Sequence, residues 1–148
     1  MSSKLKVLLL LLAFPFSVAA QTSPTEDATA VFDRFLSSLA NSDIEGVINL
    51  FTEDALFWGT GSQTLVEETS GIREYFSNLS SQPAGQTIAR ALNYSAIELS
   101  EHSVLVSGMW EVIPAGQNTA TPLRISMVLI LRDNEWKIIQ FHNSNVPD

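Results

Sequence analysis

The chain contains no cysteine. This absence excludes disulfide bonds, thiolate nucleophiles and cysteine-ligated metal sites, because each of them needs the sulfur atom of that residue. Only two histidines are present, and neither belongs to an H-x-x-x-H or H-E-x-x-H motif, so we expect no metal site and no cofactor. The fold must therefore depend on its apolar core, for which a hydrophobic content of 45% is adequate.

Basic residues are also scarce. The chain has eight lysines and arginines against sixteen acidic residues, which gives a formal charge of −8. Such a surface repels both the phosphate backbone of nucleic acids and anionic lipid headgroups. We therefore expect no nucleic-acid partner, and the acidic surface most simply serves solubility.

Long apolar runs are absent except at the N-terminus, where residues 1–20 read "MSSKLKVLLLLLAFPFSVAA". Two lysines, a short apolar run broken by Pro15 and small residues before Gln21 are typical of a secretory signal peptide. The run is short for a membrane span, which needs about 20 apolar residues, although an uncleaved anchor is the alternative. We predict cleavage after Ala20 and export to the periplasm or the medium, with no membrane association afterwards.

Removal of Lys4 and Lys6 leaves six basic against sixteen acidic residues, a formal charge of −10. The remaining residues, 21–148, have the length of one domain with its own core. Helical signals come first in this segment. Ser23, Pro24 and Glu26 form a capping-box signature, and apolar residues then recur every three or four positions up to Leu39. Further helices are predicted over 42–51 and 70–81.

Strand signals dominate the second half. A short strand is predicted over 55–61, a brief one over 63–68, and four long ones with period-two patterns over 87–99, 103–113, 122–132 and 135–144. Short turns between successive strands favour an antiparallel meander. The predicted fold class is α+β: a cone made of a curved antiparallel sheet of four to six strands packed on three helices, open at one end as a pocket.

Large apolar side chains occur on both faces of the strand "RISMVLILR". An antiparallel sheet usually leaves one face polar, so this pattern indicates that the outer face is covered as well. Since no further helix is predicted, a second copy of the chain is the simplest cover. We therefore predict a homodimer or a larger homo-oligomeric ring.

Three stretches resemble a known family. "LFTEDALFWGT", "GIREYFSNL" and the final hairpin "RDNEWKIIQFHNSNVP" are similar to segments of the nuclear transport factor 2-like superfamily, including SnoaL-like proteins. The greatest similarity is to the association domain of calcium/calmodulin-dependent protein kinase II and its stand-alone bacterial relatives. The resemblance implies a cone with a polar-lined pocket and self-assembly. It implies no kinase activity, because the chain lacks a glycine-rich loop, an "HRD" and a "DFG" motif.

His142 is the first candidate site residue. Counting by twos along the last strand places it on the same face as Trp136, Ile138, Gln140 and Ser144. If that face lines the cone, then Gln140, His142 and Ser144 form a polar row inside the pocket, where an imidazole can bind a carboxylate or transfer a proton. The alternative is a hydrogen-bonded histidine that holds the C-terminal tail.

Two arginines and two tryptophans complete the predicted pocket. Arg90 and Arg124 lie within strands, where together they could hold a small anion. Alternatively each pairs with an acidic residue such as Glu98 or Glu111, or is exposed at an edge of the sheet. Trp58 and Trp110 could contact a ring or an acyl chain, or simply fill the core. The ligand-binding prediction comprises Trp58, Arg90, Trp110, Arg124, Gln140, His142 and Ser144.

Other motifs are weaker indications of a functional site. Glu53 and Asp54 form an acidic pair that a helix exit explains as well as catalysis does. Asn78 and Asn93 match the glycosylation acceptor pattern, which matters only in a eukaryotic secretory pathway.

The first functional hypothesis is an exported homo-oligomeric domain that binds a small molecule with a carboxylate or carbonyl group. The alternatives are an isomerase-like enzyme of the SnoaL or ketosteroid isomerase type with His142 as general base, and a pure oligomerisation module.

Overall fold

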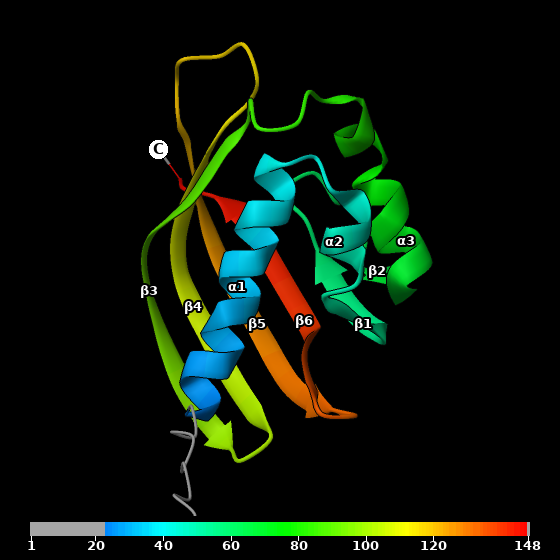
Figure 1. Ribbon diagram of the computed structural model, residues 1–148, viewed down its shortest axis with the longest axis vertical. Helices are drawn as coiled ribbons and strands as arrows, with labels where there is room; N and C mark the ends of the chain where they lie inside the picture. Colours follow the sequence, from blue (N-terminus) through cyan, green and yellow to red (C-terminus); the bar gives the residue numbers. More distant parts are fainter. Residues whose placement is uncertain (1–22, 148) are drawn as a thin grey trace, which may run out of the picture.

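The computed structural model describes residues 23–147 (Figure 1). The predicted signal peptide, residues 1–20, lies outside the described residues. Three α-helices and one 3-10 helix pack against a six-stranded sheet with the strand order β2-β1-β6-β5-β4-β3. The α+β cone is confirmed, with six strands. No helix of residues 23–147 is long and apolar enough to cross a membrane.

Helix α1 (Pro24–Ala40) begins at the predicted capping box. The Ser23 hydroxyl accepts a hydrogen bond from the backbone of Glu26 at 3.2 Å, and the Glu26 carboxylate accepts one from the backbone of Ser23 at 2.9 Å. These bonds satisfy two backbone donors that have no partner within the helix. The buried stripe of α1 faces the sheet and contacts β3, β4 and β6; it consists of Ala28, Val31, Phe32, Phe35, Leu36 and Leu39.

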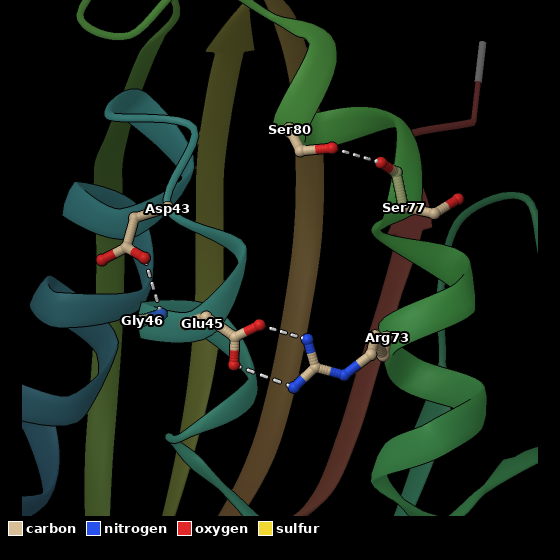
Figure 2. Close-up of polar contacts among 6 residues, drawn as sticks. All are labelled: Asp43, Glu45, Gly46, Arg73, Ser77 and Ser80. Carbon is tan, nitrogen blue, oxygen red and sulfur yellow. Dashed lines mark hydrogen bonds and ion pairs between the residues drawn. The ribbon is translucent and has the colours of Figure 1, made fainter.

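Helices α2 (Ile44–Ile48) and α3 (Glu68–Tyr75) lie on the same side of the sheet as α1 (Figure 1). An ion pair joins them (Figure 2). Both terminal guanidinium nitrogens of Arg73 in α3 donate to the carboxylate of Glu45 in α2, and the distance from Nη2 to Oε2 is 2.9 Å. The hydrogen bond from Arg73 lowers the pKa of the Glu45 carboxyl below its usual value. The 3-10 helix η1 (Ser77–Ser81) follows α3 in the segment where the sequence predicts one longer helix.

Strands β3 (Ile88–Ser100), β4 (Ser103–Ile113), β5 (Thr121–Arg132) and β6 (Glu135–Asn145) form the predicted antiparallel meander. Strand β1 (Phe51–Trp58) pairs with β6 in parallel orientation and with the two-residue β2 (Val66–Glu67) in antiparallel orientation. Glu53 and Asp54 lie within β1 rather than at a helix exit, because the strand begins four residues earlier than predicted.

The core between helices and sheet is rich in aromatic rings. Phe57 of β1 and Phe141 of β6 stack with ring centroids 5.0 Å apart, and Phe35 of α1 packs on Phe141 at 5.1 Å. All three side chains are almost completely buried. Each such pair adds about 0.5–1.5 kcal/mol to the stabilisation from burial, so this cluster holds α1, β1 and β6 together.

An irregularity in β6 determines which side chains face the core. Ile138 pairs with Leu129 of β5 and Gln140 pairs with Val128, so Ile139 is an extra residue, a β-bulge. Before the bulge, Trp136 and Ile138 point inward; after it, the inward residues are Phe141 and Asn143. The inward and outward positions beyond Ile139 are therefore exchanged relative to the predicted period-two count.

Candidate ligand cavity

A cavity lies on the inner side of the cone. Its volume is about 210 Å³, and it lies between the sheet, α1, α3 and η1. Most of the wall is aromatic and aliphatic. The lining residues are Phe35, Leu39, Phe57, Gly59, Thr60, Tyr75, Phe76, Leu79, Thr87, Trp110, Val112, Leu123, Phe141 and Asn143.

A chain of hydrogen bonds runs along the cavity wall and ends at an exposed threonine. The indole N–H of Trp110 donates to Oδ1 of Asn143 at 2.8 Å, and Nδ2 of Asn143 donates to the hydroxyl of Thr60 at 2.6 Å. Trp110 and Asn143 are buried, whereas Thr60 is exposed. Because an indole N–H can only donate, it fixes the amide with its oxygen towards Trp110 and its NH₂ group towards Thr60.

This orientation leaves donors available at the polar corner formed by Asn143 and Thr60. One amide N–H of Asn143 bonds to Thr60, and the second has no acceptor among the described residues. The Thr60 hydroxyl accepts that bond and keeps its own proton for donation. The corner is therefore suited to a ligand atom that accepts hydrogen bonds, such as a carbonyl oxygen.

Tyr75 of α3 forms another part of the cavity wall. Its ring contacts Phe57 with centroids 4.8 Å apart, and its hydroxyl accepts a long hydrogen bond of 3.5 Å from the backbone of Gly61. Only glycine fits at position 59, since a Cβ atom there would lie 2.2 Å from the Tyr75 ring. Tyr75 is the one ionisable side chain in this lining; no carboxylate or imidazole of residues 23–147 contributes to it.

Of the seven predicted site residues, Trp110 lies in the cavity wall. The predicted row of Gln140, His142 and Ser144 points the other way. His142 is exposed on the outer face of the sheet, opposite the cavity, because the bulge at Ile139 reverses the alternation of β6. The placement of this row inside the cone is wrong, while the prediction that these residues bind a ligand stays a prediction.

The other predicted residues share that outer face. Trp58 of β1 lies beside His142 in the parallel register, and Arg124 of β5 lies beside Ser144. Arg90 of β3 is further away and forms an ion pair with Glu111 of β4 at 2.5 Å. Arg90 and Arg124 therefore do not form a joint anion site; Arg90 has the acidic partner that was the alternative.

Sequence reasoning missed the cavity residues Asn143, Thr60 and Tyr75. Asn143 directly follows His142, so a count shifted by one residue would have found it. The signal available in the sequence was the tyrosine–phenylalanine pair of α3 and the threonine between Gly59 and Gly61. No group of three or more histidine, aspartate or glutamate residues within the described part of the chain is placed to hold a metal ion.

The family model of the SnoaL-like domain matches residues 28–148. The chain belongs to the SnoaL-like family. A search of curated proteins found no match.

Solved structures agree in fold. A candidate calcium/calmodulin-dependent protein kinase II association domain from Xanthomonas campestris is 21% identical with a TM-score of 0.74, over 86% of this chain and 94% of that one. An NTF2-like protein of unknown function from Pseudomonas putida is 13% identical with a TM-score of 0.74, over 84% and 87%. A candidate scytalone dehydratase from Novosphingobium aromaticivorans is 12% identical with a TM-score of 0.70, over 82% and 83%. At these identities the likeness shows the fold, so the function of this SnoaL-like chain must be argued from its own residues.

Proposed function

We propose that this SnoaL-like protein binds, in its cone cavity, a small and mainly apolar molecule that carries one hydrogen-bond acceptor. The observation that supports this most is the polar corner of Asn143 and Thr60 in a mostly apolar wall. Binding sites for small molecules have this composition: apolar surface for affinity and a few fixed polar groups for orientation.

The size of the cavity limits the ligand. An apolar cavity of about 150 Å³ holds benzene, and drug-sized ligands need about 300 Å³ or more. A volume of about 210 Å³ is therefore suited to a single substituted ring or a short acyl chain. A carbonyl fits the corner better than a carboxylate, because no cationic side chain of the described residues lines the cavity to balance a charge.

The geometry favours binding over acid–base catalysis by His142. A general base must come within hydrogen-bond reach of the proton that it removes. The imidazole of His142 lies across the sheet from the cavity, with the backbone of β6 between them. An isomerase-like reaction in this cavity therefore cannot use His142.

A matched pair of probes tests the proposal. Acetophenone and α-methylstyrene have closely similar shapes, because C=CH₂ replaces C=O, but only the ketone has an acceptor. We expect acetophenone to bind about five to tenfold more tightly, as one net hydrogen bond of about 1 kcal/mol requires. The Trp110 indole resonance should report binding in NMR titrations. The preference should disappear in Asn143→Leu, and equal affinity of both probes for the unchanged protein would contradict the assigned corner.

We also propose that the protein is exported and self-associates. Exposed apolar side chains concentrate on β3, which is an edge strand of thirteen residues. Ile97 and Leu99 are 56% and 55% exposed, and Ile88 and Leu92 are similar. An edge with unpaired backbone groups can pair with the same edge of a second copy about a two-fold axis.

Native mass spectrometry of exported protein tests both statements. We expect a subunit mass that corresponds to a chain beginning at Gln21. We also expect an oligomer that the Leu99→Lys substitution dissociates. The matched control is Leu65→Lys, since Leu65 is also exposed, at 38%, but lies outside β3. A monomer at high protein concentration would refute self-association, and an intact N-terminus would refute cleavage.

A further inference from the structure

A second concave region lies where α1, the link between α2 and β1, and the hairpin of β5 and β6 meet. Its volume is about 390 Å³, and it shares no residue with the cone cavity. We call it the Arg34 cleft. It is lined by Arg34 of α1, Asn49 and Leu50 of the link, Asn134 of the hairpin turn, and Glu135, Trp136 and Lys137 of β6.

The charges of the Arg34 cleft leave one cation unbalanced. Glu135 is the one carboxylate in the lining, and Lys137 forms an ion pair with it at 2.8 Å. The hydrogen bond from Lys137, and to a smaller extent the charge of Arg34, lowers the pKa of the Glu135 carboxyl. Arg34 is exposed and forms no ion pair with any residue of 23–147. Its guanidinium therefore keeps a planar set of N–H donors available for an external oxyanion.

Trp136 provides a second unused donor. Its side chain is only 9% exposed and lines the cleft. The indole N–H has no acceptor among the described residues, whereas that of Trp110 is bonded to Asn143. The Trp136 N–H is not sealed from solvent, so an acceptor atom in the cleft can reach it. Because an indole N–H can only donate, this edge of the cleft favours an oxygen that accepts hydrogen bonds.

Hydrogen bonds between distant segments hold the walls of the cleft in place. The backbone N–H of Ile138 donates to the Leu50 carbonyl at 2.8 Å, and Nζ of Lys137 donates to the Asn49 carbonyl at 2.6 Å. Both bonds fix the link between α2 and β1 on β6. The donors of the cleft are therefore positioned before a ligand arrives, which lowers the entropic cost of binding.

We propose that the Arg34 cleft binds the carboxylate group of a small monoanionic molecule. Arg34 contacts the carboxylate in bidentate geometry, and the indole N–H of Trp136 donates to one of its oxygens. The Trp136 ring offers an apolar surface for the body of the ligand. Two cations and one carboxylate give the lining a formal charge of +1, which balances a carboxylate but not a doubly charged phosphate.

The Arg34 cleft does not depend on a free outer face of the sheet. Arg34 belongs to α1, and Trp136 points towards the helices. A second copy of the chain on the outer face therefore leaves both donors accessible. The site is also independent of the polar corner of Asn143 and Thr60, which lies in the cone cavity.

NMR titrations with sodium benzoate and with benzamide, at constant ionic strength, test the proposal. The two probes have closely similar shapes, but only benzoate is charged. We expect benzoate to shift the Trp136 indole resonance saturably, and benzamide to bind there about tenfold more weakly or less. The Trp110 indole resonance reports the cone cavity separately, so failure of one proposal is visible without the other.

Substitutions of Arg34 distinguish a built site from general attraction to positive charge. Arg34→Gln should weaken benzoate binding by about tenfold or more, since a charged hydrogen-bonding partner is lost. Arg34→Lys should weaken it severalfold, because lysine keeps the charge but lacks the planar fork of donors.

Arg124→Gln is the matched control. Arg124 is also exposed and has no ion pair within the described part of the chain, but it lies on the outer face of the sheet. We expect this substitution to leave the affinity for benzoate unchanged. Shifts of Trp136 that rise linearly with benzoate, equal affinity for benzamide, or an equal loss in Arg34→Gln and Arg124→Gln would each overturn the site.

Discussion

Replacement of Asn143 by alanine should destabilise the protein through the tryptophan that it leaves behind. The Trp110 indole N–H donates to the Asn143 amide at 2.8 Å, and Trp110 is only 4% exposed. A buried donor without a partner costs about 1–3 kcal/mol. Thr60, the other partner, is exposed and can bond to water instead. We therefore expect Asn143→Ala to lower the free energy of unfolding by about 2–3 kcal/mol.

A double-mutant cycle isolates the free-energy cost of the unpaired Trp110 N–H. Trp110→Phe removes the donor and leaves a ring, so Asn143→Ala should cost less in that background, by about 1–2 kcal/mol. Urea unfolding at pH 7 measures all four proteins. Asn145→Ala is the control on the same strand, because Asn145 is exposed, and we expect a change within about 0.5 kcal/mol. Effects of Asn143→Ala and Trp110→Phe that simply add would refute the reasoning.

Three further predictions concern a helix end, an ion pair and a strand contact. Ser23→Ala should lower the unfolding free energy by about 1 kcal/mol through loss of the α1 cap, measured by urea unfolding. An NMR titration should show the pKa of the Glu45 carboxyl below its usual range, and Arg73→Gln should return that pKa to the usual range. Because the pKa is lowered in the folded state, the ion pair stabilises the fold slightly above the unfolded pKa of about 4.3. This small stabilisation is lost as pH falls through the folded pKa. Gly108→Ala should cost about 1–3 kcal/mol, since a Cβ would lie 2.2 Å from the backbone of β3, whereas Gly61→Ala, with open space around it, should be neutral; similar midpoints for the two would contradict the contact.

Local patterns in the sequence were sufficient to predict most of the fold. The capping box at Ser23 and the apolar stripe of α1 were predictable because both depend on neighbouring residues of one helix. The four long strands were predictable from their period-two patterns and intervening turns. Trp110 faces the cavity side, as its place in the regular register of β4 with β5 from Ser103 to Val112 requires, and its role in ligand binding stays a prediction.

The face on which β6 presents its polar residues could not be obtained in the same way. A bulge at Ile139 exchanges the two faces, yet isoleucine is a common strand residue and carries no bulge signal of its own. The bulge exists because β5 and β1 pair with both halves of β6 and each half must place its apolar residues on the core. That requirement involves three strands at once.

The sequence by itself therefore determined most of the element types, their order and the α+β cone, since these follow from periodicity, capping and turns. The SnoaL-like family was indicated by the resemblance of three segments. Only the tertiary structure decided that Asn143 faces the cavity, that His142 and Arg124 face the opposite side, and that Arg90 has Glu111 as its partner. Those facts depend on register between distant strands, and register shifted by one residue moves every side chain to the other face.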